Sequence, residues 1–194
     1  MIRDNLIDTI LSRAFDYIDN NDYIGAVKIY ARAWKRVCDN ISKDNIKSIE
    51  EYYKKYDSDE YISDWVCVYI DALQCCFEET GNKKYLEEII DFKEKYSEFF
   101  NADKYFSKII IQYESEAKFY LGKKQEAIDE LKKLIKMHKE DEEIYIIISR
   151  LYTKINMFKE AKEVLKEGIK KCEFNAILEE MLGQIEKEEK RSKK

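Results

Sequence analysis

Apolar residues recur every three or four positions along most of the chain, and this spacing predicts amphipathic helices. Breaks in the pattern coincide with glycine or asparagine, which most readily adopt the left-handed backbone that ends a helix. We therefore expect an all-α chain without any sheet. The expected helix-ending positions are Asn21, Gly81, Gly122 and Asn156.

The pattern also repeats at a fixed interval. Ala161 follows Ala127 by 34 residues, and Leu165 follows Leu131 by the same step. A fixed period of this length indicates stacked structural units, each of which buries its apolar face only against its neighbours. The spacing outlines four helix pairs, at approximately 4–39, 59–100, 103–139 and 141–173.

The residues at these positions resemble the tetratricopeptide repeat, whose 34-residue unit is a pair of antiparallel helices. The best-matched series is Tyr145, Ile148, Ser149, Tyr152, Asn156, Phe158, Ala161, Leu165 and Gly168. The N-terminal unit resembles it with Ile10, Ala14, Tyr17, Asn21, Tyr23, Ala26, Tyr30 and Ala33. The resemblance implies a right-handed α-α superhelix (a solenoid), a single domain over residues 1–194 and a concave groove.

Small residues stand where the two helices of a pair would cross. They are Ala14, Ser149 and Gly183 on first helices, and Ala26, Ala127 and Ala161 on second helices. A small side chain lets the neighbouring helix approach closely, so we expect all six to be buried in helix contacts.

Two parts of the chain depart from the repeat. An extra helix is expected at approximately 43–56, with Ile46, Ile49, Tyr52, Tyr53 and Tyr56 on one side, and a capping helix at approximately 175–190. Leu86 and Ala127 are 41 residues apart, so the second helix of the pair at 59–100 is expected to run long.

The register of the helix before Gly122 stays open. Strict alignment to the repeat places the charged residues Glu114 and Lys118 at positions that the family fills with apolar side chains. The apolar residues of that segment are instead Phe106, Ile110, Tyr113, Ala117 and Tyr120. We therefore assign no site there.

Charge is high but balanced. The 35 Lys and Arg residues and 40 Asp and Glu residues leave a net charge of −5, with the two signs interleaved. This balance is typical of a solvated helical surface and argues against a nucleic-acid partner. No apolar run approaches the roughly 18 residues of a membrane span, and the N-terminal segment lacks a signal-peptide cleavage site. We expect a cytoplasmic protein without a membrane partner.

Reactive chemistry is sparse in the sequence. The five cysteines are Cys38, Cys67, Cys75, Cys76 and Cys172, and His138 is the single histidine. No CxxC pair occurs, so we expect free, buried thiols with neither disulfides nor a metal site. Phosphate-binding, dinucleotide-binding and hydrolase motifs are also missing from the sequence. The prediction is therefore a protein with no cofactor and no catalytic residues.

A weaker resemblance concerns the segment Tyr61 to Val66, "YISDWV", which follows the extra helix. This layout is similar to bacterial tetratricopeptide proteins that often end in a zinc-binding SEC-C tail. The chain ends instead in "EKEEKRSKK", so that zinc site is not implied. We interpret the last basic residues of the sequence, Lys190, Arg191, Lys193 and Lys194, as a solvated helix end, with a nucleic-acid arm as the alternative.

The repeat resemblance implies a non-catalytic interaction or scaffold module that binds a peptide or helix of a partner in its groove. The candidate contact residues are Ile146, Ile147, Arg150 and Lys154, with Leu11 and Phe15 as a second set. Arg150 and Lys154 could grip a carboxylate, or merely solvate the helix face. Two other classes stay open: a nucleic-acid-associated helical-repeat regulator, and an enzyme with an unrecognised site.

Overall fold

The computed structural model describes residues 2–3, 5–57, 59–101 and 103–192. In this part the chain forms ten helices that pack against their neighbours, which confirms the all-α prediction. One short strand pair was not expected: β1 (Ile2–Arg3) pairs in parallel with β2 (Tyr56–Asp57). Among the described helices, none combines the length and apolar character that a membrane span requires.

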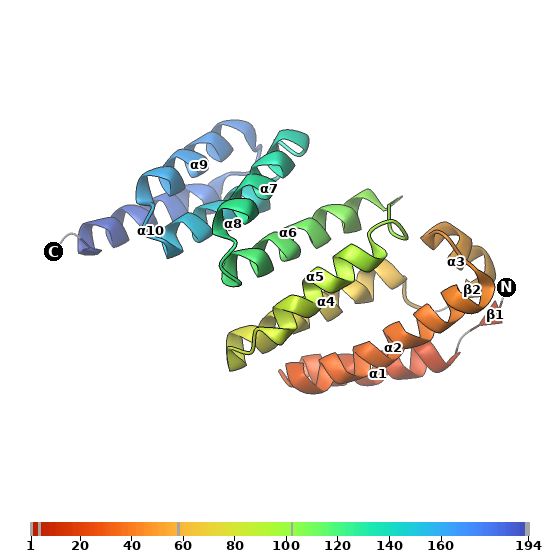
Figure 1. Ribbon diagram of the computed structural model, residues 1–194. Coiled ribbons are helices and arrows are strands. Elements are labelled where there is room, and N and C mark those ends of the chain that lie inside the picture. Colours follow the sequence, from red (N-terminus) through yellow and green to blue (C-terminus); the bar gives the residue numbers. More distant parts are fainter. Residues whose placement is uncertain (1, 4, 58, 102, 193–194) are drawn as a thin grey trace. The chain divides into compact units, whose positions relative to one another are not determined.

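Two compact units divide the chain, Met1–Ala117 and Lys118–Lys194. In the first unit α1 packs on α2, α2 on α4, and α4 on α5 (Figure 1). Its helices are α1 (Asn5–Asp19), α2 (Tyr23–Asp44), α3 (Ile49–Lys55), α4 (Ile62–Thr80), α5 (Lys84–Tyr96) and most of α6 (Lys104–Tyr120).

The second unit contains the end of α6 and four further helices. They are α7 (Lys124–Met137), α8 (Glu142–Lys154), α9 (Phe158–Lys171) and α10 (Ala176–Ser192). Helix α8 packs against α7, α9 and α10, so it is central to this unit (Figure 1).

Left-handed residues end the helices where the sequence predicted. Asn21, Gly81, Gly122 and Asn156 have φ angles of 57°, 67°, 97° and 60°. Asn45, at φ 53°, ends α2 in the same way and was not predicted. Asparagine tolerates this region better than other residues that carry a Cβ.

Helix crossings depend on small residues, as predicted at five of six positions. Ala14, Ala26, Ala127, Ser149 and Ala161 are all fully buried. The prediction for Gly183 is wrong, because a Cβ there would meet no atom within 4 Å. The close crossing in this unit lies at Gly168, where a Cβ would stand 2.8 Å from Cγ of Tyr145 and 2.9 Å from Cδ1 of Leu178.

Aromatic side chains fill the core of the first unit. The ring of Trp34 lies 4.9 Å from that of Phe92, and the rings of Phe100 and Phe106 are 4.1 Å apart, centroid to centroid. The expectation that the second helix of this pair runs long is wrong. Helix α5 ends at Tyr96, and turns follow that bury Phe99 and Phe100 in the core.

Helix α3 is shorter than the expected extra helix, because α2 continues to Asp44. Of the five residues expected on one side of this helix, Ile46 and Tyr56 lie outside α3. Ile46, Ile49, Tyr52 and Tyr56 are buried, whereas Tyr53 is only partly buried. Polar contacts fix the position of α3. The amide of Asn40 donates to the hydroxyl of Tyr52 at 3.1 Å, and the backbone N–H of Ile49 donates to the carbonyl of Phe99 at 3.0 Å.

Acid is expected to loosen the junction between α2 and α3. Lys55, 2.8 Å from Asp44, and then the hydroxyl of Tyr56 hold the pKa of the Asp44 carboxyl below its usual value. In the unfolded chain that pKa returns to about 3.9, so the stabilisation is present above this pH and is lost as pH falls through the lower folded value.

The measurement is urea unfolding between about pH 5 and pH 2. Asp44→Asn removes the titrating group, so the variant should start less stable than wild type and lose less further stability over this range. Parallel stability curves for the two proteins would contradict the assignment of this pKa shift.

Candidate functional site

The predicted contact residues of α8 fall into two groups. Arg150 and Lys154 lie exposed, one helical turn apart, and Ile146 is half-buried one turn earlier. Side chains four residues apart share one side of a helix, so Ile146, Arg150 and Lys154 form one stripe, which we term the α8 stripe. The Nζ of Lys154 lies 5.0 Å from the ring centroid of Tyr120, a cation–π distance.

Ile147 and Leu11 do not reach an open surface. They are only 6% and 1% exposed, so the expectation that they face a groove is not met. Helix α8 packs on three neighbours, which leaves a narrow exposed stripe rather than a broad face. Phe15 is partly buried, with its ring 6.3 Å from that of Tyr30 in an edge-to-face contact.

Local hydrogen bonds hold α8 in place. The side chain of Asp141 caps its first turn by accepting from the N–H of Glu143 at 3.2 Å. The hydroxyl of Tyr145 donates to the carbonyl of Lys139 at 3.0 Å. Beside α8, hydrogen bonding to Tyr152 raises the pKa of Lys132, and Asp129 and Glu160 raise it further. Lys132 therefore keeps its charge throughout the physiological pH range.

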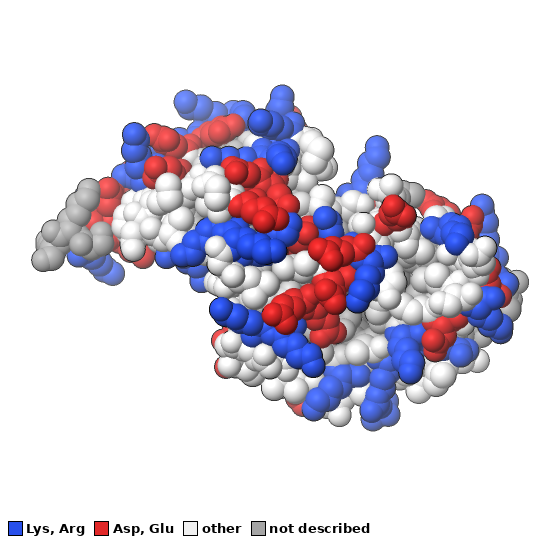
Figure 2. Space-filling model, in the orientation of Figure 1, with Lys and Arg blue, Asp and Glu red and all other residues white. Residues whose placement is uncertain are grey.

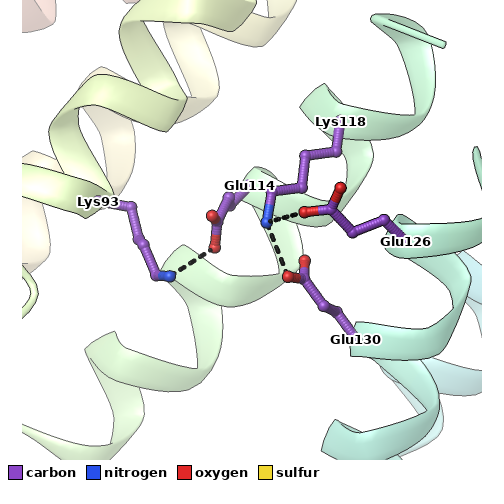
Figure 3. A network of polar contacts seen from close by, with 5 residues as sticks. All are labelled: Lys93, Glu114, Lys118, Glu126 and Glu130. Carbon is purple, nitrogen blue, oxygen red and sulfur yellow. Dashed lines mark hydrogen bonds and ion pairs between the residues drawn. The ribbon is translucent and has the colours of Figure 1, made fainter. Parts of the chain in front are cut away.

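Buried charges on α6 are the feature that sequence reasoning missed. Glu114, Glu116 and Lys118 are only 3%, 4% and 8% exposed. In the first unit, Nζ of Lys93 on α5 lies 3.2 Å from the carboxylate of Glu114 (Figure 3). Strict alignment to the repeat places Glu114 and Lys118 inward, and the structure buries both. It also buries Phe106, Ile110 and Ala117 of the apolar set, so the burial of α6 does not select between the two registers.

In the second unit, Lys118 anchors the end of α6 to α7. Its Nζ lies 2.7 Å from the carboxylate of Glu130 and 3.0 Å from that of Glu126 (Figure 3). The hydrogen bond from Lys118 lowers the pKa of Glu126, which therefore stays ionised at neutral pH. Lys118 is buried whereas its two partners keep access to water, so this arrangement of the helices is favoured because a shifted register would separate a buried ammonium from the carboxylates of Glu126 and Glu130. The role of these ion pairs is structural.

The surface charge is mixed. On the face drawn in Figure 2, basic and acidic side chains lie in small interspersed groups. Among the described residues, no group of three or more His, Cys, Asp or Glu side chains is placed to hold a metal ion. Among the last basic residues of the sequence, Lys190 and Arg191 are exposed on α10, whereas Lys193 and Lys194 lie outside the described residues.

All five cysteines are free thiols, and the thiols on α4 are expected to react slowly. Cys76 is buried, while Cys67 and Cys75 are partly buried. Burial raises the pKa of Cys67 to about 12 and the pKa values of Cys75 and Cys76 to about 11. At a pH of about 8 the native thiolate fraction is then far below that of a free thiol, whose pKa is about 8.5.

Titration with an aromatic disulfide reagent measures these rates. In the native protein the three α4 thiols should react more than about tenfold slower than glutathione, and all five should react rapidly in denaturant. Five fast thiols in the folded protein would contradict the burial of this helix face.

No protein-family model matches this chain, and no curated protein and no solved structure matches it. What the protein does must therefore be inferred from the chemistry of its own surface.

Proposed function

We propose that this protein is a non-catalytic interaction module that binds a peptide or helix of a partner protein. The observation that carries the proposal is the α8 stripe, in which a half-buried Ile146 precedes two exposed cations at four-residue spacing on a capped, well-packed helix. Binding side chains on a rigid helix lose little freedom when a partner docks.

The chemistry of the stripe selects a partner segment. A guanidinium can hold a carboxylate through two parallel hydrogen bonds, and an ammonium adds a less directional attraction. Ile146 offers an apolar contact beside these charges. The fitting ligand is a segment with a hydrophobic side chain followed by one or two carboxylates.

We further propose that the helix pairs form a tetratricopeptide-like right-handed array. Three observations support this: the 34-residue spacing, the left-handed residues at the helix ends, and the buried small residues at the crossings. In such arrays function lies in the exposed helix faces, and the buried positions serve stability.

Affinity capture from the native cell, followed by mass spectrometry, would identify the partner. A fluorescein-labelled peptide with one leucine followed by two aspartates provides a defined probe. Arg150→Glu combined with Lys154→Glu should weaken binding of partner and probe at least about tenfold, which corresponds to about 1.4 kcal/mol, while the melting temperature barely moves.

The matched control is Lys166→Glu with Lys170→Glu on α9. These lysines are also exposed and four residues apart, so the control makes the same change in charge. Its affinity should stay within about twofold of wild type if the stripe itself binds. Equal weakening in both double variants, or unchanged affinity in the α8 variant, would remove the stripe from the binding site.

A further inference from the structure

Exposed apolar side chains gather at one end of the second unit. Phe174, Met137 and Ile177 are 79%, 67% and 52% exposed; Met137 ends α7, Phe174 lies in the connection from α9 to α10, and Ile177 lies in the first turn of α10. Large apolar residues exposed singly are common, but several in one region of a small unit mark an interaction surface.

The two connections meet at a shared hollow. A depression of about 300 Å³ is lined by Phe174 and Glu173 from one connection, and by Glu140, Asp141 and Glu142 from the other. A shallower depression alongside it shares Glu140 and Asp141 and reaches Met137. Phe174 and Met137 therefore flank the same acidic loop.

Three of the four carboxylates that line this hollow are available to a ligand. Asp141 caps α8, but Glu140, Glu142 and Glu173 make no ion pair among the described residues. Lys136 and Lys139 line only the shallower depression, so negative charge is concentrated next to Phe174. Burial raises the pKa of the nearby Cys172 thiol, and the charges of Glu142, Asp141 and Glu140 raise it further, whereas the charge of Lys171 lowers it.

Hydrogen bonds hold the two connections that carry these residues in place. The hydroxyl of Tyr145 donates to the carbonyl of Lys139, and the side-chain amide of Asn175 donates to the carbonyl of Ile169, each at 3.0 Å. Gly168, near the end of α9, packs closely against Tyr145 and Leu178. The surface is therefore largely preformed, which lowers the entropic cost of binding.

We propose that this acidic end surface, formed by Met137, Glu140, Glu142, Glu173, Phe174 and Ile177, docks a lysine- or arginine-rich segment of a partner protein through an apolar anchor. Charge complementarity selects the occupant: partner cations meet the unpaired carboxylates, and a cation can also lie over the exposed ring of Phe174. The apolar anchor covers Phe174 and Ile177. This surface is separate from the α8 stripe and takes a partner of opposite charge.

A defined peptide tests the proposal on the full chain. The probe is a fluorescein-labelled peptide with lysines on both sides of one leucine, followed by fluorescence anisotropy. Two matched peptides replace the leucine by glycine or the lysines by glutamates. Wild type should bind the first peptide more tightly than the glycine peptide, and its affinity for the first peptide should fall as salt is raised. The glutamate peptide carries the chemistry proposed for the α8 stripe, so it should not compete with the first peptide for the acidic end surface.

Variants then locate the site. Glu140→Lys with Glu173→Lys should weaken binding at least about tenfold, and Phe174→Ala at least about threefold. Glu186→Lys with Glu188→Lys makes the same change in charge at exposed positions farther along α10 and should stay within about twofold of wild type. The mutated side chains are exposed or half-exposed, so the melting temperatures should agree, which separates lost binding from lost folding.

Three results would overturn the proposal. If both charge-reversal variants weakened peptide binding equally, the peptide would be attracted to the overall negative charge of the protein and not to this surface. Unchanged affinity in Phe174→Ala would remove the apolar anchor. Concentration-dependent self-association of wild type that disappears in Glu140→Lys with Glu173→Lys would make the surface a contact between two copies of this chain. The peptide with one leucine and two aspartates and the variant Arg150→Glu with Lys154→Glu, both used for the α8 stripe, test that site independently of these outcomes.

Discussion

Trp65→Ala is expected to lower the free energy of unfolding of the first unit by about 3 to 5 kcal/mol. Trp65 is buried on α4, and its ring lies parallel to that of Tyr30, 6.2 Å away, and 6.3 Å from that of Trp34. Alanine would leave a cavity bounded by aromatic rings from α2 and α4, which cannot close without moving both helices.

The loss should come from packing, because the indole N–H of Trp65 makes no hydrogen bond in the structure. Trp65→Phe, which keeps much of the volume, should therefore recover a large part of the stability. Tyr105→Ala removes an exposed ring and should change the free energy by no more than about 0.5 kcal/mol. Urea unfolding followed by circular dichroism measures all three variants. A loss below about 1 kcal/mol for Trp65→Ala would mean that this aromatic core is loosely packed.

Lys118→Met is expected to lower the free energy of unfolding of the second unit by about 1 to 2 kcal/mol, between the values for an exposed and a fully buried ion pair. Methionine fills similar space but leaves the carboxylates of Glu126 and Glu130 without their shared cation. The loss stays below that for a fully buried pair because both glutamates keep access to water.

A double-mutant cycle separates charge pairing from volume. Adding Glu130→Gln to Lys118→Met should cost less than Glu130→Gln costs in wild type, because the unpaired carboxylate is removed. Lys118→Arg keeps the charge and should be milder than Lys118→Met. If Lys118→Met proved more stable than wild type, desolvation of the ammonium would outweigh its ion pairs, and the register would depend on apolar packing alone.

The sequence predicted those parts of the fold that depend on local chemistry. A helix ends in the left-handed region only where glycine or asparagine permits it, so Asn21, Gly81, Gly122 and Asn156 could be identified without coordinates. The buried alanines followed from the repeat spacing. Asn45 was missed because it falls between the first pair and the extra helix, where the spacing gives no guidance.

Features that depend on contacts between distant helices could not be predicted. Glu114 and Lys118 are charged residues of a kind usually found on a surface, and the positions of Lys93, Glu126 and Glu130 contribute to making their burial tolerable. Ile147 was assigned to a groove because one buried face was assumed for α8. The helix contacts three others, and that arrangement is a property of the whole unit.

Both tryptophans of the chain, Trp34 and Trp65, lie in the unit Met1–Ala117, and the unit Lys118–Lys194 contains none. Intrinsic tryptophan fluorescence is therefore a reporter of one unit, whereas far-ultraviolet circular dichroism reads the helices of both. If the two signals change at the same denaturant concentration, the chain unfolds as one cooperative body. If they separate, each unit has its own stability, and the aromatic core makes the two measurable without any added label.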